Sequence, residues 1–172
     1  MIARSLRGVA AALVLVAAIA SVGQAQKASS GRFAIAGGLA MPMGDFDDLA
    51  DMGFQVGGSY TVAMNDMYSL RFNADWSHYA VPGGGANWTQ LGLMANAVAG
   101  MKDRPVYGLI GLGLVNTKLT IDAGGDASSS DFAFNIGGGF NKNNWAIEAR
   151  YQSAQANGGS INSIPIVFVW KF

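Results

Sequence analysis

The residues that could carry out acyl-transfer chemistry are Ser77 and His78, with Asp75 close by. A serine hydrolase needs an imidazole within hydrogen-bond reach of the serine hydroxyl. His78 is the only histidine of the chain. The residues around it alternate between apolar and polar, which predicts a β-strand, and neighbouring side chains of a strand point to opposite faces. Ser77 and His78 therefore cannot pair while both lie in this strand, and we expect no catalytic residue here.

Two other groups of residues could bind a metal ion or a phosphate. Four aspartates could supply oxygen ligands to calcium; they are Asp45, Asp47, Asp48 and Asp51. Their spacing lacks the glycine and the final glutamate of an EF-hand loop, so a solvated acidic loop is the better interpretation. The glycine runs 83–85 and 137–139 lack the strand-to-helix context of a phosphate loop and are interpreted as turn or bulge glycines. We expect no metal site and no cofactor.

Charged residues on two predicted strands form a further group. Arg71 and Asp75 share the parity of one strand, and Glu148 and Arg150 share that of another. Residues of one parity lie on one face of a sheet, and buried charges persist in proteins when they are paired. We predict an ion-paired network that also includes the amides on the same faces, which are Asn73 and Gln152.

β-Strands must position these faces, and the alternation of apolar and polar residues predicts eight strands. They cover residues 32–41, 52–64, 67–78, 88–99, 106–116, 132–140, 145–153 and 163–172. The segment 106–116 is apolar at both parities, so its two faces stay unassigned. The connections are predicted to alternate between long loops (42–51, 82–85, 117–131 and 155–162, with 117–131 the longest) and short turns (65–66, 102–105 and 141–144). Strands of this length cross a bilayer at about 45° tilt, so the pattern predicts an all-β fold, an eight-stranded antiparallel up-and-down transmembrane β-barrel.

Composition agrees with a membrane β-protein. Hydrophobic residues make up 51% of the chain and charged residues 13%, about half the usual share of ~25%. The 24 glycines favour tight turns over long helices. The formal net charge is zero, which gives no electrostatic reason to expect nucleic acid as a partner. The chain has no cysteine, so disulfides and thiolate metal sites are excluded.

Alternation alone does not decide which face is inside. An apolar interior would make a secreted soluble barrel that binds an apolar ligand, as lipocalins do, whereas an apolar exterior would face lipid. Aromatic residues of the apolar parity concentrate near strand ends, as interfacial girdles do; the expected girdle is Tyr60, Tyr68, Trp76 and Trp145. The polar parity suits the narrow interior of eight strands. We therefore favour the apolar exterior, with the charged network plugging the lumen; a small pore lined by the same charges is the alternative.

The amino terminus has the features of a secretory signal peptide. Arg4 and Arg7 precede an apolar run from Val9 to Ala20, and small residues at Gly23 and Ala25 suit cleavage after Ala25. The run is too short to span about 30 Å of hydrocarbon as a helix. We predict a cleaved signal peptide over 1–25 and an exported barrel domain over 26–172.

The last strand ends in large apolar residues at alternate positions: Ile164, Ile166, Phe168, Trp170 and Phe172. This pattern is similar to the carboxy-terminal assembly signal of the small eight-stranded outer-membrane β-barrels of the OmpA/OmpX type. The segments 42–46 and 53–57 resemble the first loop and second strand of that family. The resemblance covers the whole mature chain. It implies that Ile166, Phe168, Trp170 and Phe172 form the assembly signal and that the barrel-insertion machinery recognises Phe172.

The resemblance also implies an outer-membrane location in a Gram-negative-type bacterium, with outer-membrane lipid, the insertion machinery and periplasmic chaperones as partners. Members of the family do not share one activity, so the fold implies little about function. The reading that we favour is a non-enzymatic outer-membrane barrel with a structural or surface-interaction role, whose loop ligand the sequence does not identify. A lipid-modifying enzyme that uses His78 is the least favoured alternative.

Overall fold

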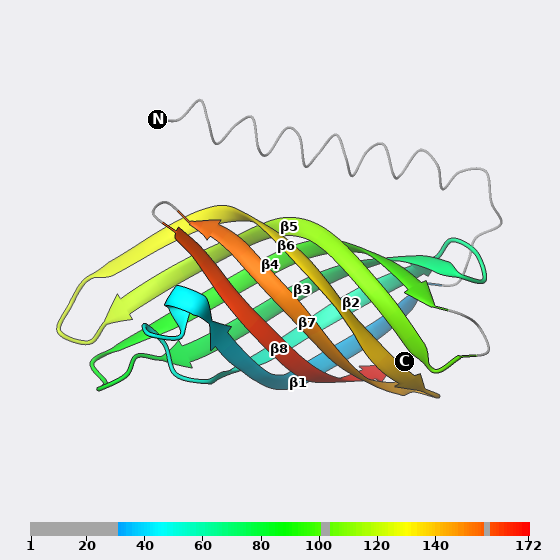
Figure 1. Ribbon diagram of the computed structural model, residues 1–172, viewed down its shortest axis with the longest axis horizontal. Coiled ribbons are helices and arrows are strands. Elements are labelled where there is room, and N and C mark those ends of the chain that lie inside the picture. Colours follow the sequence, from blue (N-terminus) through cyan, green and yellow to red (C-terminus); the bar gives the residue numbers. More distant parts are fainter. Residues whose placement is uncertain (1–30, 101–103, 157–158) are drawn as a thin grey trace, which may run out of the picture. The chain divides into compact units, whose positions relative to one another are not determined.

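The computed structural model describes residues 31–100, 104–156 and 159–172. These residues form a closed barrel in which each strand pairs antiparallel with its neighbours in sequence and the last strand pairs with the first (Figure 1). The strands are β1 (Arg32–Met43), β2 (Gly53–Ala63), β3 (Tyr68–Ala80), β4 (Ala86–Gly100), β5 (Val106–Ile121), β6 (Asp126–Lys142), β7 (Trp145–Ala156) and β8 (Gly159–Lys171), and a short 3-10 turn, η2 (Gly44–Phe46), follows β1. The predicted eight-stranded antiparallel fold is confirmed. The signal peptide predicted over 1–25 and the turn residues Lys102 and Asp103 lie outside the described residues.

The strands are strongly tilted because the barrel closes with a stagger. Following paired residues once round the wall from Phe33 of β1 leads back to β1 at Met43, ten residues further along. With eight strands this stagger corresponds to a tilt of about 40°. Each residue then advances about 2.5 Å along the barrel axis. The described residues contain no helix that is long and apolar enough to cross a membrane.

The exterior of the barrel is an uninterrupted apolar band. Each strand contributes outward-facing residues that are apolar or glycine, and none of them is buried. They are the alternate residues of 33–41, 54–62, 68–76, 91–99, 106–114, 132–140, 145–151 and 164–172. Most rows span eight residue steps, about 20 Å along the barrel axis, which is close to the ~25 Å apolar belt of outer-membrane barrels. The soluble, lipocalin-like alternative required the apolar parity to face inward, so it is wrong.

Strand β5 shows why its faces could not be assigned from the sequence. Its inward row contains Tyr107, Leu109 and Val115, and its outward row contains Ile110 and Leu112. Both rows are apolar because this part of the lumen is filled by hydrocarbon side chains. Met94 and Val115 are buried there together with Ala133 of the neighbouring β6 and Ala154 of β7.

Two of the four predicted long loops are short, which corrects the expected alternation of long loops and short turns. The predicted longest loop, 117–131, is mostly strand, because β5 continues to Ile121 and β6 starts at Asp126. The predicted loop 155–162 is likewise mostly strand, since β7 reaches Ala156 and β8 starts at Gly159. Serine-rich and threonine-rich stretches looked like loops, but in a hairpin that projects into water both faces can be polar.

The projecting β5–β6 hairpin marks one edge of the membrane. Leu114 and Phe132 are the last pair of apolar residues on the outside of this hairpin. The next pair on the same side, further from the membrane centre, is Asn116 with Ser130, whose side chains are hydrogen-bonded at 2.9 Å. Both ends of the barrel sheet, Arg32 and Lys171, lie at the opposite end (Figure 1). Outer-membrane barrels have longer projections outside the cell and short turns in the periplasm, so the hairpin end is the extracellular one.

Candidate functional site: the filled lumen and the two ends of the barrel

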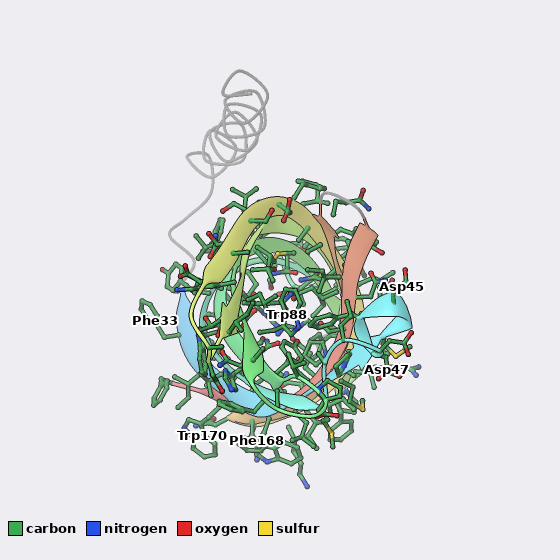
Figure 2. All side chains as sticks on the ribbon, turned by 90° about the vertical axis from the view of Figure 1, so that its left-hand side faces the viewer. Phe33, Asp45, Asp47, Trp88, Phe168 and Trp170 are labelled. Atoms are coloured by element: carbon green, nitrogen blue, oxygen red, sulfur yellow. The ribbon has the colours of Figure 1, made fainter. Side chains whose placement is uncertain are left out.

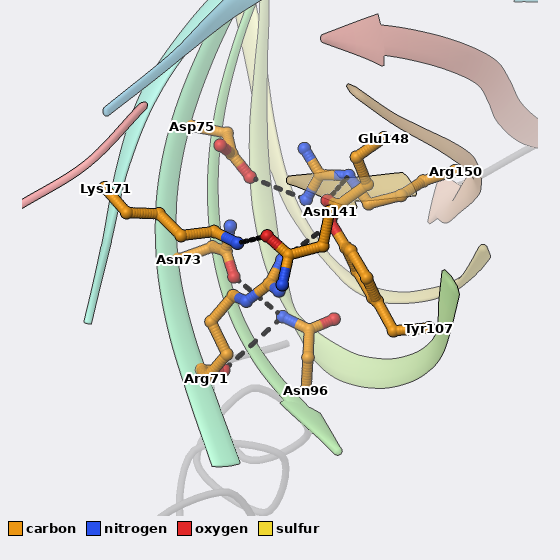
Figure 3. A network of polar contacts seen from close by, with 9 residues as sticks. All are labelled: Arg71, Asn73, Asp75, Asn96, Tyr107, Asn141, Glu148, Arg150 and Lys171. Carbon is orange, nitrogen blue, oxygen red and sulfur yellow. Dashed lines mark hydrogen bonds and ion pairs between the residues drawn. The ribbon is translucent and has the colours of Figure 1, made fainter. Parts of the chain in front are cut away.

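A carboxylate in the lumen, Glu148, binds three inward-facing groups (Figure 3). Its Oε2 accepts hydrogen bonds from Arg71 Nη1 at 2.5 Å and from the Tyr107 hydroxyl at 2.6 Å. Its Oε1 lies 3.4 Å from Arg150 Nε. The Arg71 guanidinium also lies over the Tyr107 ring, 5.3 Å from its centroid. The carboxylate is 1% exposed, so these partners replace the water that it loses on burial.

A second ion pair completes the charge balance of the lumen. Arg150 Nη1 donates to Asp75 Oδ2 at 3.2 Å, and both side chains are buried. Two arginines therefore face two carboxylates across the lumen, so the group carries no net charge. Paired charges of this kind are far less costly to bury than single ones. The four residues come from β3 and β7, on opposite sides of the barrel wall, and their side chains cross the space between them.

The other residues predicted for this network have different environments. Asn96 Nδ2 donates to Asn73 Oδ1 at 3.0 Å, beside the charged group. Gln152 is buried, but its Oε1 has no hydrogen-bond partner among the described residues. Nearer the periplasmic end, Lys171 Nζ donates to Asn141 Oδ1 (Figure 3).

Four polar side chains of the lumen each lie opposite a glycine on a neighbouring strand. Asp75 pairs with Gly57, Asn96 with Gly111, Tyr107 with Gly139 and Arg150 with Gly137. A Cβ atom at any of these glycines would overlap the neighbouring strand or the polar side chain itself. The glycines thus provide the volume that the charged and aromatic side chains occupy.

Buried amides line the lumen on the extracellular side of the ion pairs. Polar atoms without a protein partner include Gln55 Nε2, Gln90 Oε1 and both amide atoms of Asn135. Buried polar atoms of this kind are usually hydrogen-bonded by internal water. The interior is therefore polar on the extracellular side of the ion pairs.

Residues of the first loop close the extracellular mouth. Phe46 of η2 is 2% exposed and packs edge-on against Tyr79 and Trp88, with ring centroids 5.2 and 5.8 Å away. Trp88 Nε1 donates to the Leu49 carbonyl at 3.2 Å. Trp88 lies in the middle of the mouth in the end-on view of Figure 2. We call Phe46, Tyr79 and Trp88 the aromatic cap; Ala40, Ala50 and Ile161 pack against it.

The candidate hydrolase residues lie on opposite sides of the wall. Ser77 is buried in the lumen, where its hydroxyl donates to Gln55 Oε1 at 3.3 Å. His78 faces outward and stacks on Trp76, with ring centroids 5.9 Å apart. The two side chains therefore do not form a dyad. The part of the chain that the structure describes holds no cluster of three or more His, Asp or Glu side chains that could bind a metal ion.

The residues predicted for the aromatic girdle lie on the outside of the barrel near the edges of the apolar band. Tyr60 and Tyr68 are at the periplasmic edge, and Tyr60 packs against Phe33 with ring centroids 4.7 Å apart. Trp145 stacks on Phe168 at 6.0 Å at the same edge. Trp76 is near the extracellular edge. Figure 2 shows Phe33, Phe168 and Trp170 pointing away from the barrel.

The two ends of the barrel carry opposite charge. Among the described residues the extracellular end has seven aspartates and one lysine, which are Asp45, Asp47, Asp48, Asp51, Asp122, Asp126, Asp131 and Lys118. The periplasmic end has four basic residues and one acidic residue, which are Arg32, Arg104, Lys142, Lys171 and Asp66. Lys118 Nζ lies 2.5 Å from Asp126 Oδ2 and holds the pKa of that carboxyl below its usual value. The remaining extracellular aspartates leave that end strongly negative.

Sequence reasoning missed two functional residues. Tyr107 was missed because both parities of β5 are apolar, so the sequence does not show that Tyr107 faces the lumen. Phe46 was missed because it lies among aspartates. A lone aromatic in an acidic loop is itself a sign that the loop folds onto an apolar surface.

A closed barrel with an apolar exterior and a filled polar interior defines an integral membrane β-barrel, since the bilayer requires every backbone group to be paired. The chain matches the family described as "Outer membrane protein beta-barrel domain" over residues 10–172 and belongs to that family. It is therefore an outer-membrane protein. No curated protein matches the chain.

Solved structures with the same fold include proteins of three bacteria. Ail, the attachment invasion locus protein of Yersinia pestis, is 16% identical, with a TM-score of 0.59 over 85% of this chain and 100% of Ail. Neisserial surface protein A is 18% identical, with a TM-score of 0.58 over 86% of this chain and 100% of the Neisserial protein. The N-terminal barrel domain of Pseudomonas aeruginosa OprF is 15% identical, with a TM-score of 0.53 over 85% of this chain and 100% of the OprF domain. Identities this low show a shared fold and leave the role of this chain to its own residues.

Proposed function

We propose that this protein is a closed, non-conducting and non-catalytic outer-membrane barrel that acts through its extracellular end, as a structural and surface-interaction element of the envelope. The observation that carries this proposal is the double obstruction of the lumen. The neutral group of Arg71, Asp75, Glu148 and Arg150 crosses the middle, and the aromatic cap covers the mouth. Eight strands leave an interior just wide enough for side chains, so these two groups leave no open channel.

Conductance across a planar bilayer tests this proposal directly. We expect the refolded wild-type protein to give no stable single-channel steps, while an open porin in the same bilayer gives them. Stable, reproducible steps from the wild-type protein would favour the small-pore alternative and overturn the closed barrel.

Absence of catalysis is part of the proposal. The separation of Ser77 from His78 across the wall supports it, because a general base must reach its nucleophile. Vesicles that contain the protein should release no more fatty acid than empty vesicles. Lipid deacylation by the wild-type protein that is lost in His78→Ala would contradict the proposed absence of catalysis.

We further propose that a surface partner of this barrel is not polyanionic. A structure of Ail contains the heparin analogue sucrose octasulfate. The extracellular end of this chain carries seven aspartates against one lysine, so it repels sulfate groups and favours basic partners.

For biogenesis, we propose that the insertion machinery recognises the last strand through Ile166, Phe168, Trp170 and Phe172 after delivery by periplasmic chaperones. The side chains of Phe168 and Trp170 are outward and exposed, which supports their availability to a partner during assembly. Replacement of Phe172 by serine should reduce the amount of protein assembled in cells and leave refolding into pure lipid unchanged. Equal loss in both assays would contradict a recognition role.

A further inference from the structure

The periplasmic mouth of the lumen carries a group of inward-facing basic and amide side chains. Arg32 of β1 and Lys171 of β8 face inward, because they share the parity of the buried residues Ala34 and Val169. Lys171 pairs with Ala34, so Arg32 is its diagonal neighbour on the inner face. Lys171 Nζ donates to Asn141 Oδ1 of β6 (Figure 3). We call Arg32, Lys171 and Asn141 the basic mouth.

The two cations of the basic mouth have no carboxylate of their own. Among the described residues, including the terminal carboxylate of Phe172, none forms an ion pair with Arg32 or Lys171. Arg32, Arg71 and Glu148 lie within electrostatic range of Lys171. Glu148 is already shared by two arginines and a tyrosine hydroxyl, in a group whose charges balance. Two uncompensated positive charges therefore lie close together, and their repulsion favours a bound anion.

The groups that converge on the mouth are hydrogen-bond donors. The Arg32 guanidinium carries five N–H groups, and no described residue accepts a hydrogen bond from them. The Lys171 ammonium carries three N–H groups, of which Asn141 Oδ1 accepts one. A single arginine can satisfy both oxygens of a planar carboxylate. Donors from three separate strands approach from different directions, which suits the larger number of oxygens on a tetrahedral phosphate.

The basic mouth is open to the periplasm and closed on its inner side. The side chains of Arg32 and Asn141 are exposed, and that of Lys171 is partly buried. Arg71 lies deeper in the lumen, since the stagger raises the row of paired residues that joins it to Arg32. There it is held by Glu148 at 2.5 Å. A small anion can therefore reach the basic mouth without passing the ion pairs or the aromatic cap.

We propose that the basic mouth binds one phosphate group from the periplasmic side. The Arg32 guanidinium and the Lys171 ammonium hold its oxygens through charge-assisted hydrogen bonds, and the amide nitrogen of Asn141 adds a neutral donor. The phosphate is that of a soluble solute or of a lipid head group that reaches over the rim, because the recognition chemistry is the same for both. The site is independent of whether the lumen conducts and of the surface partner.

An NMR titration of the isotope-labelled barrel in maltoside micelles, which contain no phosphate, tests this site. Inorganic phosphate is the probe, and chloride at equal ionic strength is the blank. Arg32→Gln combined with Lys171→Gln removes both cations of the mouth. The matched control combines Arg104→Gln and Lys142→Gln, which remove the same charge from the same end. Arg104 lies in the turn before β5, and Lys142 has outward parity opposite Trp145. Heat-dependent gel mobility verifies that each variant is folded.

We expect phosphate to shift the signals of the basic mouth in the wild-type protein and the control. The mouth variant should bind phosphate at least about tenfold more weakly. Equal weakening in the two variants would show only general attraction to a basic end and would overturn the proposal. So would a wild-type response to phosphate that is no larger than the response to chloride.

The same titration in nanodiscs that contain phosphatidylglycerol distinguishes the two sources of phosphate. An unchanged affinity for inorganic phosphate assigns the site to a soluble phosphate. An affinity that falls as the fraction of phosphatidylglycerol rises assigns it to a lipid head group that competes for the same donors.

Discussion

Glu148 is the residue on which the interior depends most, because three groups from two other strands and its own strand converge on its carboxylate. We expect Glu148→Gln to lower the free energy of unfolding by about 3 kcal/mol, since Arg71 and Arg150 then lose a shared counter-charge in the lumen. Urea titration in lipid vesicles measures the effect. Asp126→Asn breaks an exposed ion pair and should change nothing measurable. Equal effects from the two variants would contradict the importance of the buried group.

Two adjacent glycines of β2 test the packing around the ion pairs. Gly57 faces inward, where a Cβ would overlap the Asp75 carboxylate, whereas Gly58 faces lipid, and its Cβ would lie 3.9 Å from the nearest atom. Gly57→Ala should therefore cost about 1–3 kcal/mol of unfolding free energy through overpacking. Gly58→Ala should be neutral or slightly stabilising. The same urea titration compares them, and a neutral Gly57→Ala would show that the carboxylate can move without loss.

At the scale of elements, the first loop is a folded lid in spite of its four aspartates. Because the protein has no native cysteine, single cysteines can report on the lid without background. Ala50 is 1% exposed under the aromatic cap, while Asp47 is exposed. Ala50→Cys should react with a membrane-impermeant maleimide at least about tenfold more slowly than Asp47→Cys. Adding Phe46→Gly should remove most of that difference, and equal rates in the parent pair would contradict a packed lid.

The strands themselves were predictable from the sequence because one face is apolar throughout. The alternation from Tyr68 to Trp76, for example, identified the strand, and the aromatic residues near the strand ends then indicated that its apolar side faces lipid. The strand ends beyond the membrane were not predictable, since the projecting parts of β5 and β6 are polar on the outside and rich in serine, like a loop. Parity predicted that the four charged residues share the inner face, but it did not predict which arginine pairs with which carboxylate. The lid did not, because Phe46 contacts Tyr79 and Trp88, which lie far away in sequence.

At the scale of the molecule, the charge difference between the two ends determines the kind of partner that the surface favours. We expect no binding of heparin or sucrose octasulfate at physiological salt, because the extracellular end repels anions. Calorimetry with the protein in nanodiscs measures this. A variant in which the four loop aspartates 45, 47, 48 and 51 are replaced by lysine should gain salt-sensitive binding. Tight binding by the wild-type protein would contradict a role for this charge.

We propose that the lumen is closed at two places, and single-channel conductance of four proteins tests this closure most directly. These are the wild-type protein, Phe46→Gly, a variant with Arg71, Asp75, Glu148 and Arg150 all replaced by serine, and the combination. Because the four charges balance, their joint removal leaves no unpaired charge. We predict stable current steps from the combination alone. Steps from the wild-type protein, or steps of equal size from Phe46→Gly and the combination, would contradict closure of the lumen at two places.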